Sequence, residues 1–495
     1  MGRKKGGLDF RYSSKRRFRI RWKEAVLMLL VFLAAVFAGI SVFRTLKDML
    51  GEAGTEPGEE NVTPLPSVTP VGAPEGESDG VADAEATAAG PFGLWQVPAE
   101  EVEATQAPQE EEWMADFVDT RTPVNAKGIY VKAGFLSTRL DELLELLDST
   151  ELNTIVVDMK DDDGQLTCQM EGDMISRYGT VTRYAVDIRS AMKKLKEHDV
   201  YMVARVVTFK DSMLVKKAPE LGIHLKDGTV YKDNSKMGWL NPLNREVLDY
   251  YVDIAANLKE FGFDEINFDY VRFPTEGRIS ELVLERDGEE ITRIEAITAA
   301  VKYLCEQIKP MGLYVSADVF GGVIRSAPDQ RSVGQDYREL SRYLDYICPM
   351  VYPSHYGNGY YGVDYPDTQP YKIVYNALLD SNKSLSGLPE GSRRAVVRPW
   401  LQDFTASYLK HYIRYGKEQV RAQIEAVYDS GQTQWLLWNA AVSYTRAALM
   451  TEEEADYAFE HRPAPTPTPV PASQQKEPTR LPNGGEYIDS PWKKE

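Results

Sequence analysis

Two aspartates that follow apolar, strand-like runs are the residues best suited to chemistry in this chain. Asp269 lies in EINFDYVRFP and Asp318 lies in VSADVFGG, each at or near the expected carboxyl end of its strand. Neighbouring strands run about 4.8 Å apart, so side chains from such positions can bring two carboxyl groups within roughly 5–9 Å. Such a pair suits cleavage of a glycosidic bond, because repulsion between close carboxylates helps one of them keep its proton.

Further polar and aromatic side chains are expected at the ends of the other strands. They are Asp158, Lys160, Arg205, Asn267, Arg272, Tyr352, His355, Trp400, Gln402, Asp403, Trp438 and Asn439. This mixture is typical of sugar sites, where aromatic faces cover the apolar side of a pyranose and amides or Arg bind its hydroxyls. We therefore predict that Asp269, Asp318 and Asp158 are catalytic and that the remaining residues contact a polysaccharide.

Each of these residues also has a structural interpretation. Asp158 and Lys160 could form an inward ion pair, and Asp269 could be a structural carboxylate that Arg272 neutralises. Trp400 and Trp438 could belong to the core. The run DDDG from residue 161 lacks the ligand spacing of a calcium loop, and it is better explained as a solvated acidic loop.

Alternating strand and helix patterns between the two tails must position these residues. The expected strands are Gly128–Ala133, Thr154–Lys160, Tyr201–Thr208, Glu265–Phe273, Leu313–Phe320, Tyr346–Tyr352, Ala395–Leu401 and Gln434–Asn439. The expected helices are Arg139–Asp148, Val186–Glu197, Arg245–Phe261, Ile294–Ile308, Tyr337–Tyr343, Tyr371–Asp380, Lys417–Asp429 and a closing helix after Ser443.

Eight strands, each followed by a helix, predict an α/β fold of the (β/α)8 TIM-barrel class over residues 127–460. In such a barrel the carboxyl ends of the strands converge on the catalytic face. A doubly wound open sheet is the alternative. It is less favoured, because KAGF after the first strand is not the glycine-rich phosphate loop of that fold.

The amino-terminal region predicts a membrane anchor. Residues 1–24 are rich in Arg and Lys, and residues 25–43 carry no charge. As a helix, this run spans roughly 28 Å, which matches the hydrocarbon core of a bilayer. The basic flank predicts a cytoplasmic amino terminus and an extracytoplasmic barrel. A cleaved signal peptide is the alternative, but no clear A-x-A site follows the run.

Two further segments have the composition of disordered chain. Residues 51–126 hold 17 acidic residues and a single Arg, and residues 461–495 are rich in proline. Neither has the apolar periodicity that would offset the entropy of ordering. We predict an acidic linker and a Pro-rich tail.

Three cysteines and five histidines limit the chemistry further. The sequence has no C-x-x-C motif and no H-x-x-x-H pair, which argues against a zinc site and hence against a metal-dependent deacetylase. We predict no metal and no cofactor. The basic amino terminus is explained by membrane topology, so we predict no nucleic-acid partner.

The motifs EINFDYVRFP, VSADVFGG and VVDMKDDDG resemble an uncharacterised bacterial family described as a putative glycosyl hydrolase domain, over about residues 126–450. That family is regarded as a barrel related to amylase-like glycosidases. The resemblance implies that Asp269 is the fourth-strand nucleophile. The Arg that such barrels place two residues earlier is Asn267 here, and Asp318 stands in place of their fifth-strand Glu.

Two functions from different classes follow. The first is a membrane-anchored glycoside hydrolase outside the cytoplasmic membrane, with Asp269 as nucleophile or stabilising carboxylate and Asp318 as general acid/base. In it, Asp158 and Arg272 orient this pair. Tyr352, Trp400 and Trp438 form the sugar platform. The second is a non-catalytic glycan-binding barrel. A deep cleft with a perturbed carboxylate favours the enzyme, whereas salt-bridged carboxylates favour the binder.

Overall fold

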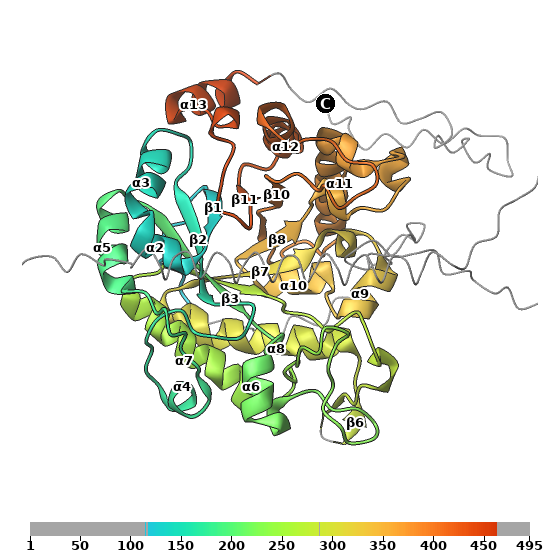
Figure 1. The fold of residues 1–495 in the computed structure, drawn as a ribbon. Coiled ribbons are helices and arrows are strands. Elements are labelled where there is room, and N and C mark those ends of the chain that lie inside the picture. The colour runs from blue at the N-terminus through green and yellow to red at the C-terminus, as the bar shows by residue number, and fades with distance from the viewer. Residues whose placement is uncertain (1–113, 115–116, 287, 463–495) are drawn as a thin grey trace, which may run out of the picture. The chain divides into compact units, whose positions relative to one another are not determined.

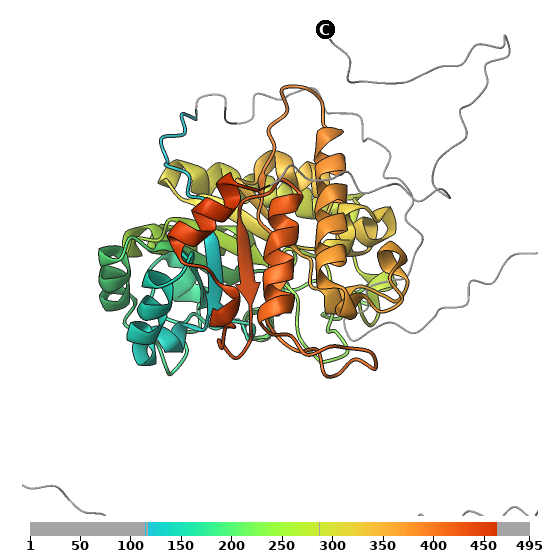
Figure 2. The ribbon, with the colours of Figure 1, turned by 90° about the horizontal axis from the view of Figure 1, so that it is seen from above.

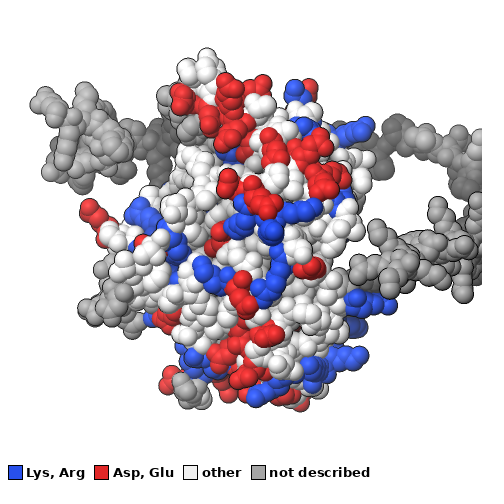
Figure 3. Space-filling model, turned by 90° about the vertical axis from the view of Figure 1, so that its left-hand side faces the viewer, with Lys and Arg blue, Asp and Glu red and all other residues white. Residues whose placement is uncertain are grey.

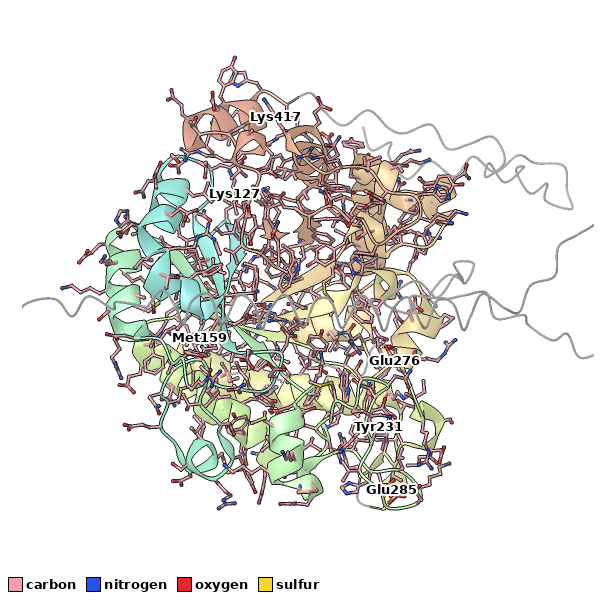
Figure 4. All side chains as sticks on the ribbon, in the orientation of Figure 1. Lys127, Met159, Tyr231, Glu276, Glu285 and Lys417 are labelled. Carbon is pink, nitrogen blue, oxygen red and sulfur yellow. The ribbon has the colours of Figure 1, made fainter. Side chains whose placement is uncertain are left out.

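Eight parallel strands form the framework that carries the predicted site residues (Figure 1). The computed structural model describes residues 114, 117–286 and 288–462. The strands are β1 (Lys127–Val131), β2 (Thr154–Lys160), β3 (Tyr201–Val207), β4 (Glu265–Asp269), β7 (Tyr314–Phe320), β8 (Tyr346–Met350), β10 (Trp400–Gln402) and β11 (Trp435–Trp438). Figure 4 labels Lys127 at the start of β1 and Met159 near the end of β2.

Pairing between the first and last strands closes the sheet into a barrel. β11 pairs in parallel with both β1 and β10, and β10 pairs with β8 through Trp400 and Met350. The expected seventh strand is split, because the short strand β9 (Val396–Val397) pairs with β8 before β10 begins. A separate antiparallel ribbon joins β5 (Glu285–Arg286) to β6 (Glu289–Glu290). The predicted (β/α)8 barrel is confirmed.

Helices surround this barrel, and α11 and α12 lie side by side next to the last strands (Figure 2). The helices are α2 (Ala133–Thr138), α3 (Leu140–Asp148), α4 (Asp173–Tyr178), α5 (Ile188–Glu197), α6 (Ser212–Lys217), α7 (Arg245–Phe261), α8 (Arg293–Ile308), α9 (Ala327–Val333), α10 (Tyr337–Tyr343), α11 (Pro370–Ser386), α12 (Lys417–Asp429) and α13 (Glu452–Glu460). On the face that includes α3 and α5, basic and acidic side chains are interspersed (Figure 3).

The longest helices have clear stop and start signals in the sequence. α7 begins where the Asn244 side chain accepts the backbone N–H of Glu246, and it ends at Gly262, whose φ of 93° favours glycine. α8 begins with a capping box between Thr292 and Glu295. α11 starts at Pro370. Proline has no backbone N–H, and because the N–H groups of a first turn have no partner within the helix, no hydrogen bond is lost there.

The interior of the barrel is polar as well as apolar. β2 and β3 are buried along their whole length, as expected of strands covered on both faces. At the beginning of β4, Glu265 accepts two hydrogen bonds of 2.9 Å from Arg398 and one from Tyr201. Ser316 donates to the same carboxylate at 2.5 Å. The buried charge of Glu265 is therefore paired and hydrogen-bonded.

β4 ends earlier than the sequence predicts. It stops at Asp269 instead of Phe273, because Tyr270 has a φ of 52° that no strand tolerates. In a regular strand Tyr270 would share the face of Phe268, but the turn places Tyr270 in the lining of the cavity described below.

The chain enters the barrel at the beginnings of the strands. Arg121 donates to the carbonyl of Leu313 at 2.6 Å and to both carboxylate oxygens of Asp345. Those residues directly precede β7 and β8, respectively. The guanidinium of Arg121 also lies 4.1 Å from the ring centre of Tyr314. This contact fixes the entering chain at the end of the barrel opposite to the carboxyl ends of the strands.

Several sequence predictions fall outside the described residues. These are the basic segment 1–24, the anchor 25–43, the predicted linker 51–126 except residues 114 and 117–126, and the predicted tail 461–495 from residue 463 onward. Among the residues that are described, no helix has both the length and the apolar character to cross a bilayer.

Candidate active site

A cavity of about 610 Å³ opens at the carboxyl ends of the strands. Its walls combine carboxylates, two arginines and many aromatic rings. Its lining residues are Asp162, Arg205, Asp269, Tyr270, Arg272, Thr275, Glu276, Asp318, Phe320, Gly321, Met350, Tyr352, His355, Trp400, Phe404, Tyr408, Trp438, Asn439, Ala440 and Ala441. This is the face on which TIM barrels carry their active sites.

Asp269, at the end of β4, is an ion-paired carboxylate in this cavity. Its Oδ2 accepts two hydrogen bonds from Arg205 on the neighbouring strand β3, at 2.9 Å from Nε and 2.5 Å from Nη2. Its Oδ1 accepts the backbone N–H of Tyr270 at 2.6 Å. Asp269 is therefore held in one orientation as an anion.

The partner of Asp269 is thus Arg205, whereas the sequence suggested Arg272. Arg205 also donates to Asp158 at 2.6 Å and lies 3.6 Å from Asp162. Burial by itself would lower the pKa of Arg205. The carboxylates of Asp269 and Asp158 outweigh this effect and hold the pKa of Arg205 well above its usual range.

Asp158 lies behind Arg205 and does not line the cavity. The hydroxyl of Tyr130 on β1 donates to its Oδ2 at 2.5 Å, while its Oδ1 receives the bond from Arg205. Burial raises the pKa of Asp158, and Arg205 opposes that rise. Asp158 therefore orients Arg205, which agrees with the orienting role that the sequence suggested and not with direct contact with substrate.

Asp318, on β7, has a different environment from Asp269. Its Oδ1 accepts hydrogen bonds from Asn267 at 2.9 Å and from the indole N–H of Trp400 at 2.7 Å. Burial, and then the negative charge of Asp269, raise the pKa of Asp318 well above its usual range. Because Oδ1 already has two donors, a proton on Asp318 sits on Oδ2, which bonds to none of the described residues.

Phe268 and Ala317 are paired in the register of β4 and β7, so Asp269 and Asp318 are the next residues on two adjacent strands. The site therefore contains an ion-paired carboxylate beside a carboxyl group whose pKa is raised by burial and by its neighbour. When the surroundings of two carboxyl groups differ in this way, one of them can donate a proton and the other can carry a negative charge.

Aromatic side chains form the remaining wall. Trp438 stacks on Tyr130 with ring centres 4.2 Å apart and meets Trp400 edge-on at 5.6 Å. Trp400 is only 1% exposed, so it serves as a wall and a hydrogen-bond donor more than as an open sugar platform. Tyr352 and His355 line the cavity beside it, and burial lowers the pKa of His355 to about 4. His355 is therefore neutral at physiological pH.

Four predicted substrate-binding residues do not line the cavity: Lys160, Asn267, Gln402 and Asp403. Asn267 is buried and donates to Asp318. The ammonium of Lys160 donates to the carbonyl of Val207 at 2.7 Å and pairs with Asp211 at 2.8 Å. Lys160 is not the partner of Asp158, because an irregular register between them turns it away. Gln402 and Asp403 are used to hold loops, as described next.

The amide of Gln402 donates to Asp367 at 3.0 Å, and its oxygen accepts the backbone N–H of Ser354. Asp403 accepts both the backbone N–H and the hydroxyl of Thr445. Asn439 lines the cavity, but its Nδ2 donates to backbone carbonyls. These polar groups shape the rim of the cavity instead of reaching into it.

Sequence reasoning missed several residues of the cavity. Tyr130 does not line the cavity, but it donates to Asp158 next to it. It had a usable signal, because a tyrosine one residue before the end of β1 lies where the strand ends converge. The position of Tyr270 depends on its positive φ, which no sequence pattern predicts. Glu276 and Tyr408 come from long loops, where spacing gives no direction.

In the part of the chain that the structure describes, no group of three or more His, Cys, Asp or Glu side chains could hold a metal ion. The three cysteines are buried and free.

Comparisons with known proteins give one family and several structures. No curated protein matches the chain. A hypothetical protein from Ruminiclostridium thermocellum is 32% identical over 39% of this chain and 97% of its own, with a TM-score of 0.35. The PgaB (BpsB) glycoside hydrolase domain from Bordetella bronchiseptica is 13% identical over 63% and 94%, with a TM-score of 0.44.

An α-galactosidase from Thermus thermophilus is 14% identical over 70% of this chain and 63% of that one, with a TM-score of 0.42. The family model described as "putative glycosyl hydrolase domain" matches residues 128–444, which contain every residue of the cavity and all of the barrel strands except Lys127 at the start of β1. The chain belongs to this family of glycosyl hydrolase domains.

Proposed function

We propose that this protein is a glycoside hydrolase that acts outside the cytoplasmic membrane on a cell-wall or surface polysaccharide. The observation that carries the proposal is the difference between two adjacent carboxyl groups in one cavity. Asp269 is ion-paired with Arg205, whereas burial and the charge of Asp269 raise the pKa of Asp318. Glycoside hydrolysis needs one group of each kind.

The mechanism follows from these two environments. Asp318 gives the proton on Oδ2 to the glycosidic oxygen as the bond from that oxygen to the anomeric carbon breaks. Asp269 supplies the negative charge that stabilises or attacks the anomeric carbon. Water then adds to that carbon and returns a proton to Asp318, so the acid is regenerated. The indole of Trp400 and the amide of Asn267 hold Oδ1 and keep Oδ2 aimed at the substrate.

The envelope location in this proposal rests on the sequence. The basic residues 1–24 and the uncharged run 25–43 together favour an uncleaved anchor with the barrel outside. A polysaccharide of the wall or surface is the substrate class that such a location offers.

The test uses the purified full-length chain with wall polysaccharides and peptidoglycan, and it measures the reducing ends released. Asp318→Asn should lower the rate by about 10²–10⁴-fold, as expected for loss of a general acid. Asp269→Asn should abolish cleavage. Asp141→Asn is the control, because that carboxylate is exposed on α3, away from the cavity. Full activity of Asp269→Asn would refute the mechanism.

One observation favours a second candidate, the non-catalytic glycan-binding barrel. The Asp269 carboxylate is already satisfied by a two-point ion pair, as a structural carboxylate would be. That barrel would bind glycans without releasing reducing ends, and both Asp→Asn variants would bind as well as the unaltered protein. Binding without cleavage across a broad panel would decide for it.

A further inference from the structure

Arg272 is a cavity-lining cation that lacks a carboxylate partner. Its Nη1 donates to the carbonyl of Phe273 at 2.8 Å. Among the described residues, no carboxylate oxygen lies within 4.0 Å of its guanidinium. By contrast Arg205, the other arginine of the cavity, bonds to two carboxylates. Arg272 therefore has hydrogen-bond donors to spare at the place where substrate must bind.

Three aromatic rings hold the guanidinium of Arg272 in place. Its central carbon lies 4.6 Å from the ring centre of Phe320, 5.0 Å from that of Trp239 and 5.1 Å from that of Tyr270. Such contacts favour the cation and restrict its orientation. The backbone at Tyr270 has a φ of 52°, a conformation that costs free energy and persists where the surroundings require it.

The charge of Arg272 is nevertheless incompletely compensated. Burial lowers its pKa, which means that the surroundings of the cation are poor in water. Lys210 adds a second positive charge, with its ammonium 4.6 Å from the centre of the Tyr270 ring. A desolvated cation is stabilised most by a direct anionic partner. Glu276 lines the same wall, but its carboxylate is outside ion-pair distance.

We propose that Arg272 receives a carboxylate of the substrate, so that the polysaccharide cleaved by this site contains an acidic sugar. The inference rests on the proposed function and narrows its substrate class. A guanidinium presents two parallel N–H groups that match the two oxygens of a carboxylate. The Arg272 nitrogens Nε and Nη2 make no hydrogen bond with the described residues and are not enclosed, so they are open to this role.

Binding of single sugars tests the inference without any need for cleavage. Glucuronate and galacturonate are titrated into the full-length protein, with glucose and galactose as their neutral counterparts and glucose 6-sulfate as the second anionic arm. Each acid should bind about tenfold tighter than its neutral counterpart, and the difference should shrink with added salt. Equal affinity for acidic and neutral sugars would overturn the inference, and tighter binding of the sulfate would overturn the choice of a carboxylate.

Variants assign the preference to one side chain. Arg272→Gln should remove the preference for acids, and Arg272→Lys should keep only part of it, because a lysine lacks the two-point geometry. Arg278→Gln is the matched control. It removes the same charge from the same loop region, but Arg278 pairs with Asp227 and Glu281 and does not line the cavity. An acid preference that survives in both Arg272 variants would overturn the inference.

The two proposals fail in different ways. Acid-selective binding through Arg272 without release of reducing ends would keep the anion site and refute the hydrolase. Cleavage of neutral glycans, with no acid preference in binding, would keep the hydrolase and refute the anion site.

Discussion

At the scale of single residues, the site depends on how differently the protein surrounds two identical side chains. Asp269 gains two charge-assisted bonds from Arg205, whereas Asp318 gains only neutral donors and a nearby negative charge. The neutral donors cannot offset burial, so Asp318 retains its proton to higher pH. The residue type alone would not distinguish the acid from the anion, but these contacts do.

This difference predicts a pH-dependent stability. The folded pKa of Asp318 lies above its unfolded value of 3.8, so folded protein binds a proton that unfolded protein has released. The free energy of unfolding should therefore fall as pH rises from about 4 to the folded pKa. This fall amounts to at most about 1.4 kcal/mol for each pH unit in that window. Asp318→Asn should abolish it, because an amide does not titrate.

Urea unfolding at pH 5 and at pH 7 checks this prediction. Asp318→Asn should exceed the unaltered protein in stability at pH 7, and the excess should be smaller at pH 5. Asp141→Asn, which removes an exposed charge, should show no such trend. A variant that is less stable than the unaltered protein at pH 7 would contradict the sign of the argument.

At the scale of elements, the strand ends decide which side chains can meet. The sequence located every barrel strand, because buried parallel strands read as continuous apolar runs that end in polar groups. For the same reason it placed Asp269 and Asp318 on neighbouring strands. It could not assign Arg205 to Asp269, because that pairing depends on the register between β3 and β4 and on the reach of a long side chain.

The irregular register after Asp158 is a second feature that could not be predicted from the sequence. Alternation puts Asp158 and Lys160 on one face, but the register shifts between them and Lys160 turns to Asp211 at the start of α6. Such an irregularity depends on the partner strand, so it is invisible in the sequence of β2 alone. The loop residues of the cavity could not be predicted, because loops have no periodic pattern of apolar residues.

The Lys160–Asp211 pair supports the packing of β2 and α6 and should matter for stability only. Lys160→Met leaves Asp211 buried without its cation, which should lower the free energy of unfolding by about 3–5 kcal/mol. The KM for a cleaved glycan should stay unchanged when rates are normalised to folded protein.

Chemical denaturation and steady-state kinetics measure the two effects separately. Lys194→Met is the matched control, because Lys194 is exposed and its loss should change stability by less than about 0.5 kcal/mol. A raised KM in Lys160→Met with little loss of stability would restore Lys160 to the substrate site.

At the scale of the whole molecule, the charge of the chain is strongly uneven. The net charge is −18, yet the first 24 residues are rich in Arg and Lys. A basic segment before an uncharged run sets the orientation of a single membrane span. The predicted membrane span and the barrel occupy separate parts of the sequence, so the predicted topology can be tested apart from catalysis.

We predict that the barrel lies outside the cytoplasmic membrane. Protease added to intact protoplasts should digest it, and an epitope placed before residue 24 should survive until lysis. A cytoplasmic protein followed in the same sample controls for leakage. Protection of the barrel in intact protoplasts would show that the predicted topology is wrong.

The contact between Arg121 and Asp345 has a mechanical consequence. A pull on the chain that enters the barrel is transmitted first to this ion pair and to the carbonyl of Leu313, at the beginnings of β7 and β8. Asp269 and Asp318 lie at the other ends of the strands, with the hydrogen-bonded sheet between. Tension applied to the chain before Arg121 would thus be spread over the sheet before it reached the two carboxyl groups, and their spacing would change little.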